Sequence, residues 1–516
     1  CLARDFDDTI LKEDTYSVNC SVPNCEGPLS EIFCSGPLVQ ANWFFELPEC
    51  PVLYSKMRLK FEPEVVIKNF YRLQRPLHKV QFKEFCEKNF ENVSYLKPAH
   101  LPDWKRVPTM FAEISDPRMS KLALELHNIW PELSREFIPD VHENNDRYPV
   151  LPVPNRFIAP GGQFQVYFYW DTYWILKGLL FSEMYDTARG VLDNFAFLMK
   201  HKGFIPNSGD IQLSGRSQPP LFTQMIWDFY NNYDKDQKSF LEEFLPLAEK
   251  EMDWWQDKRA VSAETNCPTT LGDYQQGMES GKDPEFYWSS TASACESGWD
   301  FSTRWFDMEG ENSVNIKGLR TNLIVPVDLN VFMALNFRAL SKLYGDGLGN
   351  KRKSQKYSKM ADKLQDAIQE VLFDESAGVW FDYDIETKEL RKMFFPSNIF
   401  PLLLNTTTAE GCERVVGYLK DLDVFKYKGN LEGRSKEQWD FPNGWAPISH
   451  LFVMSLLQCP QTEAQERAKK VADGFLTTIS GFGGGYPVQA GFGWTNGAAL
   501  DFIRYFYATP SPQRQD

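Results

Sequence analysis

The chain has 516 residues, of which 43% are hydrophobic and 24% are charged, and its formal net charge is −15. This composition is typical of a soluble globular protein. An acidic chain without a dense run of Lys or Arg argues against nucleic acid or an anionic membrane surface as a partner. No apolar stretch approaches the roughly 20 residues that a membrane-spanning helix needs.

The first 115 residues contain Pro, Cys and aromatic residues but little sustained periodicity, which predicts a loop-rich N-terminal segment packed on the rest of the chain. Of the ten cysteines, half fall in the first fifty residues. They are Cys1, Cys20, Cys25, Cys34 and Cys50. This clustering favours disulfides. A zinc site is not predicted, because no Cys-x-x-Cys or His-x-x-x-His spacing occurs. No other cofactor is expected either.

Three Asn-x-Ser/Thr sequons accompany the cysteines, at Asn19, Asn92 and Asn405. Such sequons accept N-linked glycans in secreted proteins. No signal peptide precedes Cys1, so we expect a mature form. The combination predicts a secreted, extracellular glycoprotein held by disulfides. Unused sequons and buried thiols are the alternative.

Helical periodicity dominates residues 116–516. Apolar residues recur at three- and four-residue spacing over 357–371 and again over 464–479, the stripe of an amphipathic helix. Similar segments lie at 117–131, 174–200, 220–257, 328–345, 393–404 and 446–458. No strand–turn–strand series is evident. The chain therefore divides into an N-terminal segment, 1–115, and a mostly α domain, 116–516.

The segments between these helices are long, rich in Gly and Pro, and loaded with Trp, Tyr, Asp, Asn and Gln. They cover 151–173, 203–221, 282–306, 436–447 and 480–497. Long ordered loops are disproportionately functional. Their regular recurrence predicts a helical barrel whose loops converge on one pocket.

The richest of these segments reads Gln-Trp-Asp-Phe-Pro-Asn-Gly-Trp-Ala-Pro at 438–447. Its Pro and Gly residues exclude an ordinary helix interior. Flat aromatic faces with Asp and Asn side chains suit the C–H surfaces and hydroxyls of a sugar. A buried aromatic loop without a ligand is the alternative for this run and for the other tryptophans.

The motifs taken together resemble those of the trehalases, the inverting glycoside hydrolases that split α,α-trehalose. Residues 160–173 read Pro-Gly-Gly-Gln-Phe-Gln-Val-Tyr-Phe-Tyr-Trp-Asp-Thr-Tyr, close to the first family signature, and 438–447 match the second intact. Further blocks lie at 205–207, 216–220, 296–301, 326–330 and 491–497. The resemblance runs in order from about residue 30 to 507, and it implies an (α/α)6 barrel.

The resemblance ends at residues that carry out catalysis in the family. An inverting glycosidase needs a carboxylic acid for the leaving oxygen and a carboxylate base that activates water. The family's acid matches Asp300. The family's base, the Glu of a Gly-Gly-Gly-Gly-Glu-Tyr run, falls at Gly485, which has no side chain to take a proton. The acidic residue usual a few positions later is replaced by Ala490.

The residues that clamp the substrate in the family are altered as well. Gln163 and Val166 stand where the first signature has Arg and Glu. Asp283 and Asp210 stand where two further arginines belong, and an N-terminal block is reduced to residues 54–56. The expected pocket is less cationic, roomier near the lost base, and still aromatic.

Two functions remain open from the sequence. The favoured one is an inactive trehalase-like protein that binds a ligand or serves a structural role, because losing a general base costs about 10²–10⁴-fold in rate. The alternative is an active trehalase or related glycosidase that uses Asp171, Glu285 or Asp440 as its base. Asp300 is expected to lack a like-charged neighbour that keeps it protonated, and so to act as a hydrogen-bonding group in its loop.

The predicted ligand is a small molecule in the barrel pocket, either a sugar or a flat apolar compound such as a pigment. The residues expected to line this pocket share the aromatic loops. They are Phe164, Trp170, Asp171, Asn207, Arg216, Gln218, Glu285, Trp299, Trp439, Asn443, Trp445 and Trp494.

Overall fold

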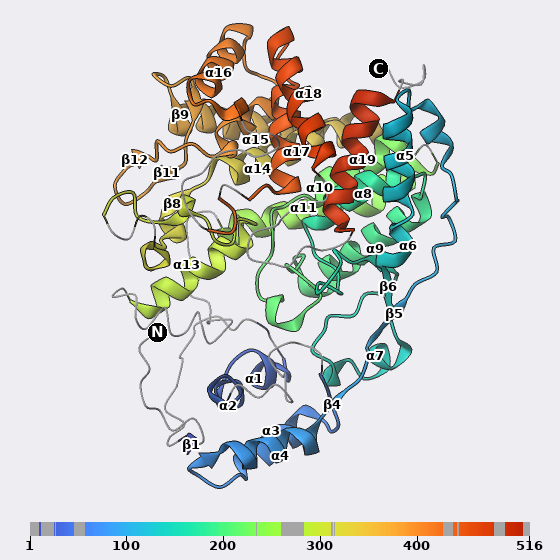
Figure 1. The fold of residues 1–516 in the computed structure, drawn as a ribbon, viewed down its shortest axis with the longest axis vertical. Coiled ribbons are helices and arrows are strands. Elements are labelled where there is room, and N and C mark those ends of the chain that lie inside the picture. Colours follow the sequence, from blue (N-terminus) through green and yellow to red (C-terminus); the bar gives the residue numbers. More distant parts are fainter. Residues whose placement is uncertain are drawn as a thin grey trace.

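The structure is a computed structural model. It describes residues 10–11, 25, 27–45, 57–233, 235–259, 283–310, 313, 315–426, 437–440, 443–478 and 491–508. Helices dominate these ranges, and the strands are short (Figure 1). No helix in the described ranges is long and apolar enough to cross a membrane.

Short helices and strands build the N-terminal segment, at the lower end of Figure 1. They are β1 (Ile10–Leu11), α1 (Ser30–Phe33), α2 (Pro37–Phe45), β2 (Met57–Leu59), α3 (Pro63–Tyr71), β3 (Leu77–His78), α4 (Lys79–Asn89) and β4 (Phe90–Asn92). Their buried side chains form a small hydrophobic core apart from the main one. A disulfide between Cys25 and Cys34 closes the loop around α1, and the Gln212 side chain donates a hydrogen bond to the Phe33 carbonyl.

Connecting elements follow before the barrel. They are β5 (Leu96–Pro98), η2 (Thr109–Glu113), α5 (Pro117–His127), α6 (Trp130–Leu133), β6 (Ser134–Phe137), α7 (Pro139–Glu143), η3 (Asn145–Arg147) and β7 (Phe157–Ile158). Strands β5, β6 and β7 form one antiparallel sheet that joins residues 96–98 to the start of the barrel. Asp116 caps α5 by accepting a hydrogen bond from the Arg118 backbone N–H, and Pro117 occupies the first helical position.

The barrel elements occupy the rest of the chain. They are α8 (Asp171–Phe181), α9 (Tyr185–Lys202), η4 (Ile211–Leu213), α10 (Phe222–Asn232), α11 (Gln237–Arg259), α13 (Pro284–Glu296), η5 (Thr303–Trp305), η7 (Ile316–Gly318), η8 (Thr321–Leu323), β8 (Ile324–Val325), α14 (Val327–Lys342), η9 (Leu343–Gly347), α15 (Lys351–Leu372), β9 (Phe373–Asp374), β10 (Val379–Trp380), β11 (Tyr383–Asp384), β12 (Glu389–Leu390), η10 (Pro396–Leu404), α16 (Ala409–Asp421), η11 (Val424–Lys426), α17 (Ala446–Leu456), α18 (Thr462–Thr477) and α19 (Gly493–Tyr507).

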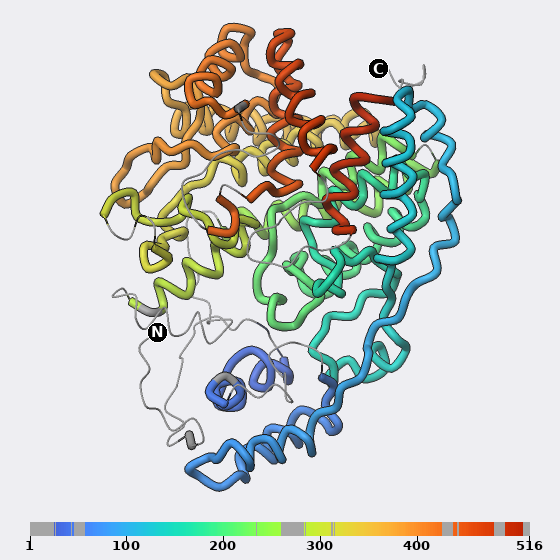
Figure 2. The backbone as a smooth tube through the Cα atoms, viewed as in Figure 1, coloured from blue at the N-terminus to red at the C-terminus, as the bar shows by residue number. Residues whose placement is uncertain are grey.

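Six of these elements close an inner ring. In order they are α8, α10, α14, η10, α17 and α19, and each packs against the next until α19 returns to α8. An outer layer covers the ring: α5 packs on α19, α9 on α8, α11 on α10, α15 on α14, and α18 on α17. Figure 2 shows the C-terminal α19 beside α5, so that the end of the chain completes the ring. The (α/α)6 barrel predicted from the sequence is confirmed.

Helices α8 and α19 pack with their backbones in close contact. A Cβ atom placed on Gly497 would lie 1.9 Å from the Trp174 carbonyl oxygen, and one on Gly178 would lie 3.0 Å from the Gly497 Cα. Side chains larger than hydrogen would force the two backbones apart. The two glycines therefore fix the separation of these helices.

The predicted helices differ from the observed ones at specific residues. The segment 174–200 is two helices, because Glu183 adopts a left-handed conformation (φ 57°) between α8 and α9. Asp236 (φ 51°) separates α10 from α11 within 220–257 in the same way. The segment 393–404 is a 3₁₀ helix, η10, that contains Pro396 and Pro401. Helix α13 lies inside the connector predicted at 282–306.

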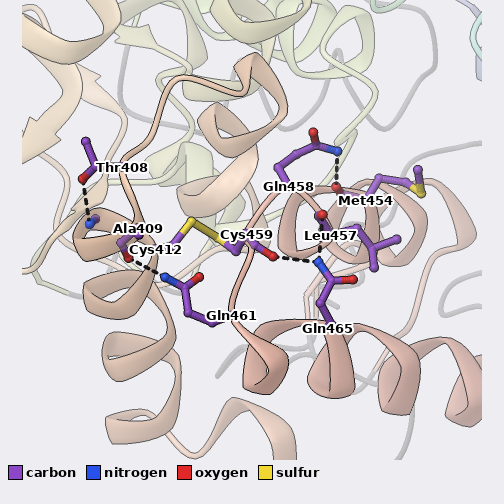
Figure 3. The surroundings of a disulfide bond; sticks show 10 residues. Thr408, Ala409, Cys412, Met454, Leu457, Gln458, Cys459, Gln461 and Gln465 are labelled. Carbon is purple, nitrogen blue, oxygen red and sulfur yellow. Dashed lines mark hydrogen bonds between the residues drawn. A yellow bond between two sulfur atoms is a disulfide. The ribbon is translucent and has the colours of Figure 1, made fainter. Parts of the chain in front are cut away.

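A second disulfide joins the outer layer to the ring. Cys412 of α16 is bonded to Cys459, which follows α17 (Figure 3). The Gln461 side chain donates a hydrogen bond to the Ala409 carbonyl (2.6 Å), and the Gln465 side chain donates one to the Cys459 carbonyl (2.7 Å). These contacts hold the start of α16 against the turn between α17 and α18.

Candidate functional site

The five tryptophans predicted to form a pocket wall lie in one cluster. Trp439 is at its centre, stacked on Trp445 with 4.3 Å between ring centroids. Its ring centroid also lies 5.7 Å from that of Trp170 and 6.1 Å from those of Trp299 and Trp494. Loops far apart in the sequence thus meet at one end of the barrel, as the motif spacing predicts. A role of these rings in ligand binding stays a prediction.

Helix ends position these rings. Trp170 and Trp445 precede the first residues of α8 and α17, and Trp494 lies in the first turn of α19. Trp299 follows α13 after Gly298, which has a φ of +80°. A Cβ atom on Gly298 would lie 2.7 Å from the Trp170 ring, so only glycine allows both the turn and the packing of that ring.

Two carboxyl groups and a guanidinium lie close together beside this cluster. Desolvation raises the pKa of Asp300 to about 6, although the nearby Arg216 guanidinium lowers it. Burial raises the pKa of Asp171 to about 8, and the charge of Asp300 adds to that rise. At neutral pH, Asp171 therefore keeps its proton and Asp300 is mostly ionised.

No hydrogen bond joins these three side chains to one another in the described ranges, and each of the two carboxyl groups accepts one from its own backbone. Asp171 is 4% exposed, and the Nε of Arg216 is buried without a partner. Desolvation is the largest cause of the raised pKa of Asp300, and its expected role as a hydrogen-bonding group in its loop stays a prediction. Polar groups left unpaired in a protein interior call for a ligand or water to satisfy them.

Asp440 has a different role from the one considered for it as a base. Its carboxylate accepts hydrogen bonds from the Ser302 hydroxyl (2.6 Å), and from the backbone N–H (2.9 Å) and hydroxyl (2.6 Å) of Thr303. It is 3% exposed. These bonds tie the loop that carries Trp439 to the loop that carries Asp300, so Asp440 is an anchor between the two.

Arg304 also holds the loop that carries Asp300. Its guanidinium makes two hydrogen bonds to Asp328 (2.7 and 2.9 Å) and two to Asp382 (2.7 and 2.8 Å), all buried. It also lies 4.7 Å from the centre of the Trp299 ring. One guanidinium is thus shared by two carboxylates, and this hydrogen-bonded cluster holds Trp299 in place.

The predicted amide residues hold the start of α8, next to the tryptophan cluster, through backbone hydrogen bonds. The Gln218 side-chain oxygen accepts a hydrogen bond from the Trp170 backbone N–H (3.0 Å). The Asn207 backbone N–H donates to the Arg216 carbonyl (2.7 Å) and its carbonyl accepts from Tyr169 (2.9 Å). The Asn207 side chain is buried. These contacts join 205–207 and 216–218 to the start of α8.

The remaining predicted residues lie further out. Phe164 is half-buried, with its ring edge-on to Phe492 at 6.0 Å. Asn443 is half-buried, and its side chain donates to the Glu437 carbonyl at 3.4 Å. Glu285 is exposed in the first turn of α13. Phe492 in turn contacts Trp494 of the tryptophan cluster, and the Asn443 backbone N–H donates a hydrogen bond to the Asp440 carbonyl (3.0 Å).

Two residues that replace family arginines now cap helices. Asp210 accepts a hydrogen bond from the Gln212 backbone N–H (3.1 Å) at the start of η4. Asp283 accepts one from the Glu285 backbone N–H (3.4 Å) at the start of α13. Gln163 is exposed and Val166 is buried. The positions Gly485 and Ala490 and residues 54–56 lie outside the described ranges.

Glu296 has no role in the sequence-based site, although it opens the block 296–301. It is 7% exposed. Its carboxylate accepts a hydrogen bond from the Ser217 backbone N–H (2.7 Å) and pairs with Arg259 (3.1 Å). It thereby holds the chain next to Arg216. Its place at the head of a recognised block was a usable signal, but its partners could not be read from the sequence.

We expect replacement of Asp171 by Asn to change how stability depends on pH. The folded-state pKa of about 8 lies above the ordinary value for Asp, so folding retains a proton that the unfolded chain releases. The contribution of protonated Asp171 to the free energy of unfolding is fully present below about pH 4 and is lost as the pH rises towards 8. Between pH 5 and pH 8, the free energy of unfolding measured in urea should fall by about 2–4 kcal/mol more in the parent than in Asp171→Asn.

The matched control for this substitution is Asp366→Asn, at an exposed position of α15. It should shift the unfolding curves equally at both pH values. Parallel curves for Asp171→Asn as well would show that the Asp171 carboxyl is not held protonated by the fold.

Comparison with known families gives one match over most of the chain. The model of the Trehalase family matches residues 54–481. Human trehalase is 34% identical, over 93% of this chain and 89% of that protein. Trehalase of Apis mellifera is 34% identical, over 92% and 84%. Trehalase of Tenebrio molitor is 31% identical, over 98% of both.

A solved structure matches the fold. Neutral trehalase Nth1 from Saccharomyces cerevisiae superposes with a TM-score of 0.58 at 19% identity, over 79% of this chain and 89% of that one. This likeness shows a common helical barrel. The family model and the relatives together carry the assignment that the motifs suggested. This chain belongs to the trehalase family.

Proposed function

We propose that this protein binds a sugar in its barrel pocket and does not hydrolyse it at an ordinary enzymatic rate. The observation that carries the proposal is the group of desolvated polar side chains beside the tryptophan cluster. Asp171 and Asp300 are desolvated carboxyl groups with raised pKa values, and the Nε of Arg216 is buried without a hydrogen-bond partner. Sugar hydroxyls are the groups that satisfy such side chains next to aromatic faces.

An apolar ligand fits these contacts less well. It would contact Trp170, Trp299 and Trp439 but leave the Nε of Arg216 without a hydrogen-bond partner. Leaving a buried polar group unsatisfied costs about 1–3 kcal/mol, and more for a charged group. A sugar therefore accounts for both the aromatic and the polar side of the pocket.

Hydrolysis is opposed by the loss of the base. Inversion requires a carboxylate that deprotonates water on the face opposite the leaving group, and the matching residue is Gly485. Of the carboxyl groups that could replace it, Asp171 keeps its proton at pH 7 and Asp440 is bound to Ser302 and Thr303. Glu285 is exposed on α13. Asp300, at the position of the acid, is thus present without a carboxylate base.

Slow hydrolysis is the second candidate, and two observations favour it. The relatives reported above are named trehalases. The pKa of Asp300, raised to about 6, suits a residue that protonates a leaving oxygen near neutral pH. In that case Glu285 would be the base. Its carboxylate has no hydrogen-bond partner in the described ranges, and it would have to move to serve in that role.

Sugar binding is testable by tryptophan fluorescence. Titration with D-glucose and with α,α-trehalose should give a saturable change in the parent. Trp439→Leu should weaken binding by about tenfold or more, because stacked aromatic surface is lost at the centre of the cluster. Trp254→Leu is the matched control, since Trp254 lies on α11 against Phe204. Equal titrations for both variants, or no saturation in the parent, would refute the sugar site.

We also propose that the protein is secreted. Disulfides persist in oxidising compartments, and the chain forms Cys25–Cys34 and Cys412–Cys459. Of the sequons, Asn92 and Asn405 are exposed, as glycan attachment requires, and Asn19 lies outside the described ranges. Protein from its native source should show few reactive thiols under denaturation. Ten reduced cysteines would contradict this proposal.

A further inference from the structure

A cavity lies between the two helical layers, and Glu296 and Ser297, next to the loop that carries Trp299, line part of it. Its volume is about 590 Å³, within the range of roughly 300–1,000 Å³ found for small-molecule pockets. It is bounded by the end of α11, by α13, and by α14 and α15. None of the five clustered tryptophans lines it, and the proposed sugar site is therefore separate.

The walls of this cavity are mainly apolar. Met333 and Phe337 on α14 face the cavity together with Met360 and Leu364 on α15. Met333, Met360 and Leu364 are only half-buried, so their apolar surface is left partly open to solvent. Helix α15 is strongly amphipathic and packs on α14. Met360 and Leu364 belong to its apolar stripe.

The charged residues on the walls are mostly neutralised. Asp328 is paired with Arg304 (2.7 Å), and Glu296 with Arg259 (3.1 Å). Lys363 on α15 is exposed and also lines the cavity. It makes no ion pair or hydrogen bond to any residue in the described ranges. One cation thus stands beside an apolar cavity in a protein whose net charge is −15.

We propose that this cavity binds an amphipathic organic monoanion, of which an alkyl carboxylate is the simplest example. The alkyl part lies against Met333, Met360 and Leu364, where its burial supplies the affinity. The carboxylate lies at Lys363, where opposite charge fixes the orientation of the ligand. The proposal does not depend on sugar binding, because the two sites share no ligand-contacting residue.

Dodecanoate is the probe that tests this site. Calorimetric titration of the full chain, below the micellar concentration of the probe, should show saturable binding with one molecule per chain. Saturating α,α-trehalose should leave that binding unchanged. No saturable binding, or displacement by trehalose, would overturn the proposal, since displacement would place dodecanoate in the barrel pocket.

Variants separate the two halves of the ligand. Lys363→Gln should weaken dodecanoate about two- to fivefold at low salt and less at high salt, as expected for an exposed ion pair. Lys359→Gln, at an exposed position one turn earlier on α15, should have no effect. Ala367→Trp fills the cavity mouth from an exposed position and should weaken binding at least about tenfold.

Dodecanol supplies the final comparison. It carries the same alkyl chain without a charge and should bind more weakly than dodecanoate, with an affinity that Lys363→Gln does not change. Equal affinity for the two probes in the parent would contradict recognition of an anion. Unchanged melting temperatures in all three variants confirm that each titration reports on the folded protein.

Discussion

The purified protein is expected to release glucose from α,α-trehalose more than about 10²-fold more slowly than a typical enzyme, whose median turnover is about 10 s⁻¹. Asp300 can supply a proton but cannot deprotonate the attacking water. In the proposed function, Gly485 occupies the position that matches the family's general base, and losing a general base alone costs about 10²–10⁴-fold. The measurement is glucose release under saturating trehalose at pH 6, near the pKa of Asp300.

Restoring single residues should show that the defect is shared. Gly485→Glu alone is expected to recover little, because Gln163, Asp210 and Asp283 still replace the arginines that orient sugar hydroxyls. Adding Arg at these three positions should recover more, although Asp210→Arg and Asp283→Arg each remove a helix cap worth about 1 kcal/mol. Full activity from Gly485→Glu alone would show that the remaining pocket is intact.

The second large effect is structural. Gly497→Ala is expected to lower the free energy of unfolding by more than about 4 kcal/mol, or to prevent folding. Its Cβ would lie 1.9 Å from the Trp174 carbonyl oxygen, which belongs to the α8 backbone and cannot rotate away. The helices would have to separate, and α8 and α19 carry Asp171 and Trp494. Urea unfolding and sugar titration should both register the change.

Gly417→Ala is the matched control for this substitution. Gly417 lies inside α16, and a Cβ atom there would meet no other atom within 4 Å. The replacement should be neutral or should stabilise the protein by about 0.4–1 kcal/mol, because alanine loses less conformational entropy in a helix. Similar losses in both variants would mean that the α8–α19 contact is not the cause.

The barrel was predictable because its repeating helices carry apolar stripes and its loops carry recognisable motifs. Helix α13 was missed for a physical reason: residues 287–292 are buried in succession, so no polar face marks its period. The breaks at Glu183 and Asp236 were missed because a left-handed conformation at a non-glycine residue is set by tertiary packing.

The site was predictable in its aromatic part and not in its charges. The motifs place Trp170, Trp299 and Trp439 together whenever the barrel closes. The raised pKa values of Asp171 and Asp300 depend on desolvation by several loops at once, which no local pattern encodes. The same holds for Asp440, whose role as an anchor arises from contact with residues 137 or more positions away.

Saturation-transfer difference NMR with α,α-trehalose tests the central claim most directly, because one sample reports both binding and hydrolysis. The account predicts transfer of saturation from the protein to the trehalose ring protons, reduced in Trp439→Leu and unchanged in Trp254→Leu. We also expect the anomeric signal of trehalose to decay at a turnover rate below about 0.1 s⁻¹, which is about 10²-fold under the median enzyme rate. Glucose appearing at a rate within about 10²-fold of 10 s⁻¹, or no saturation transfer at all, would contradict it.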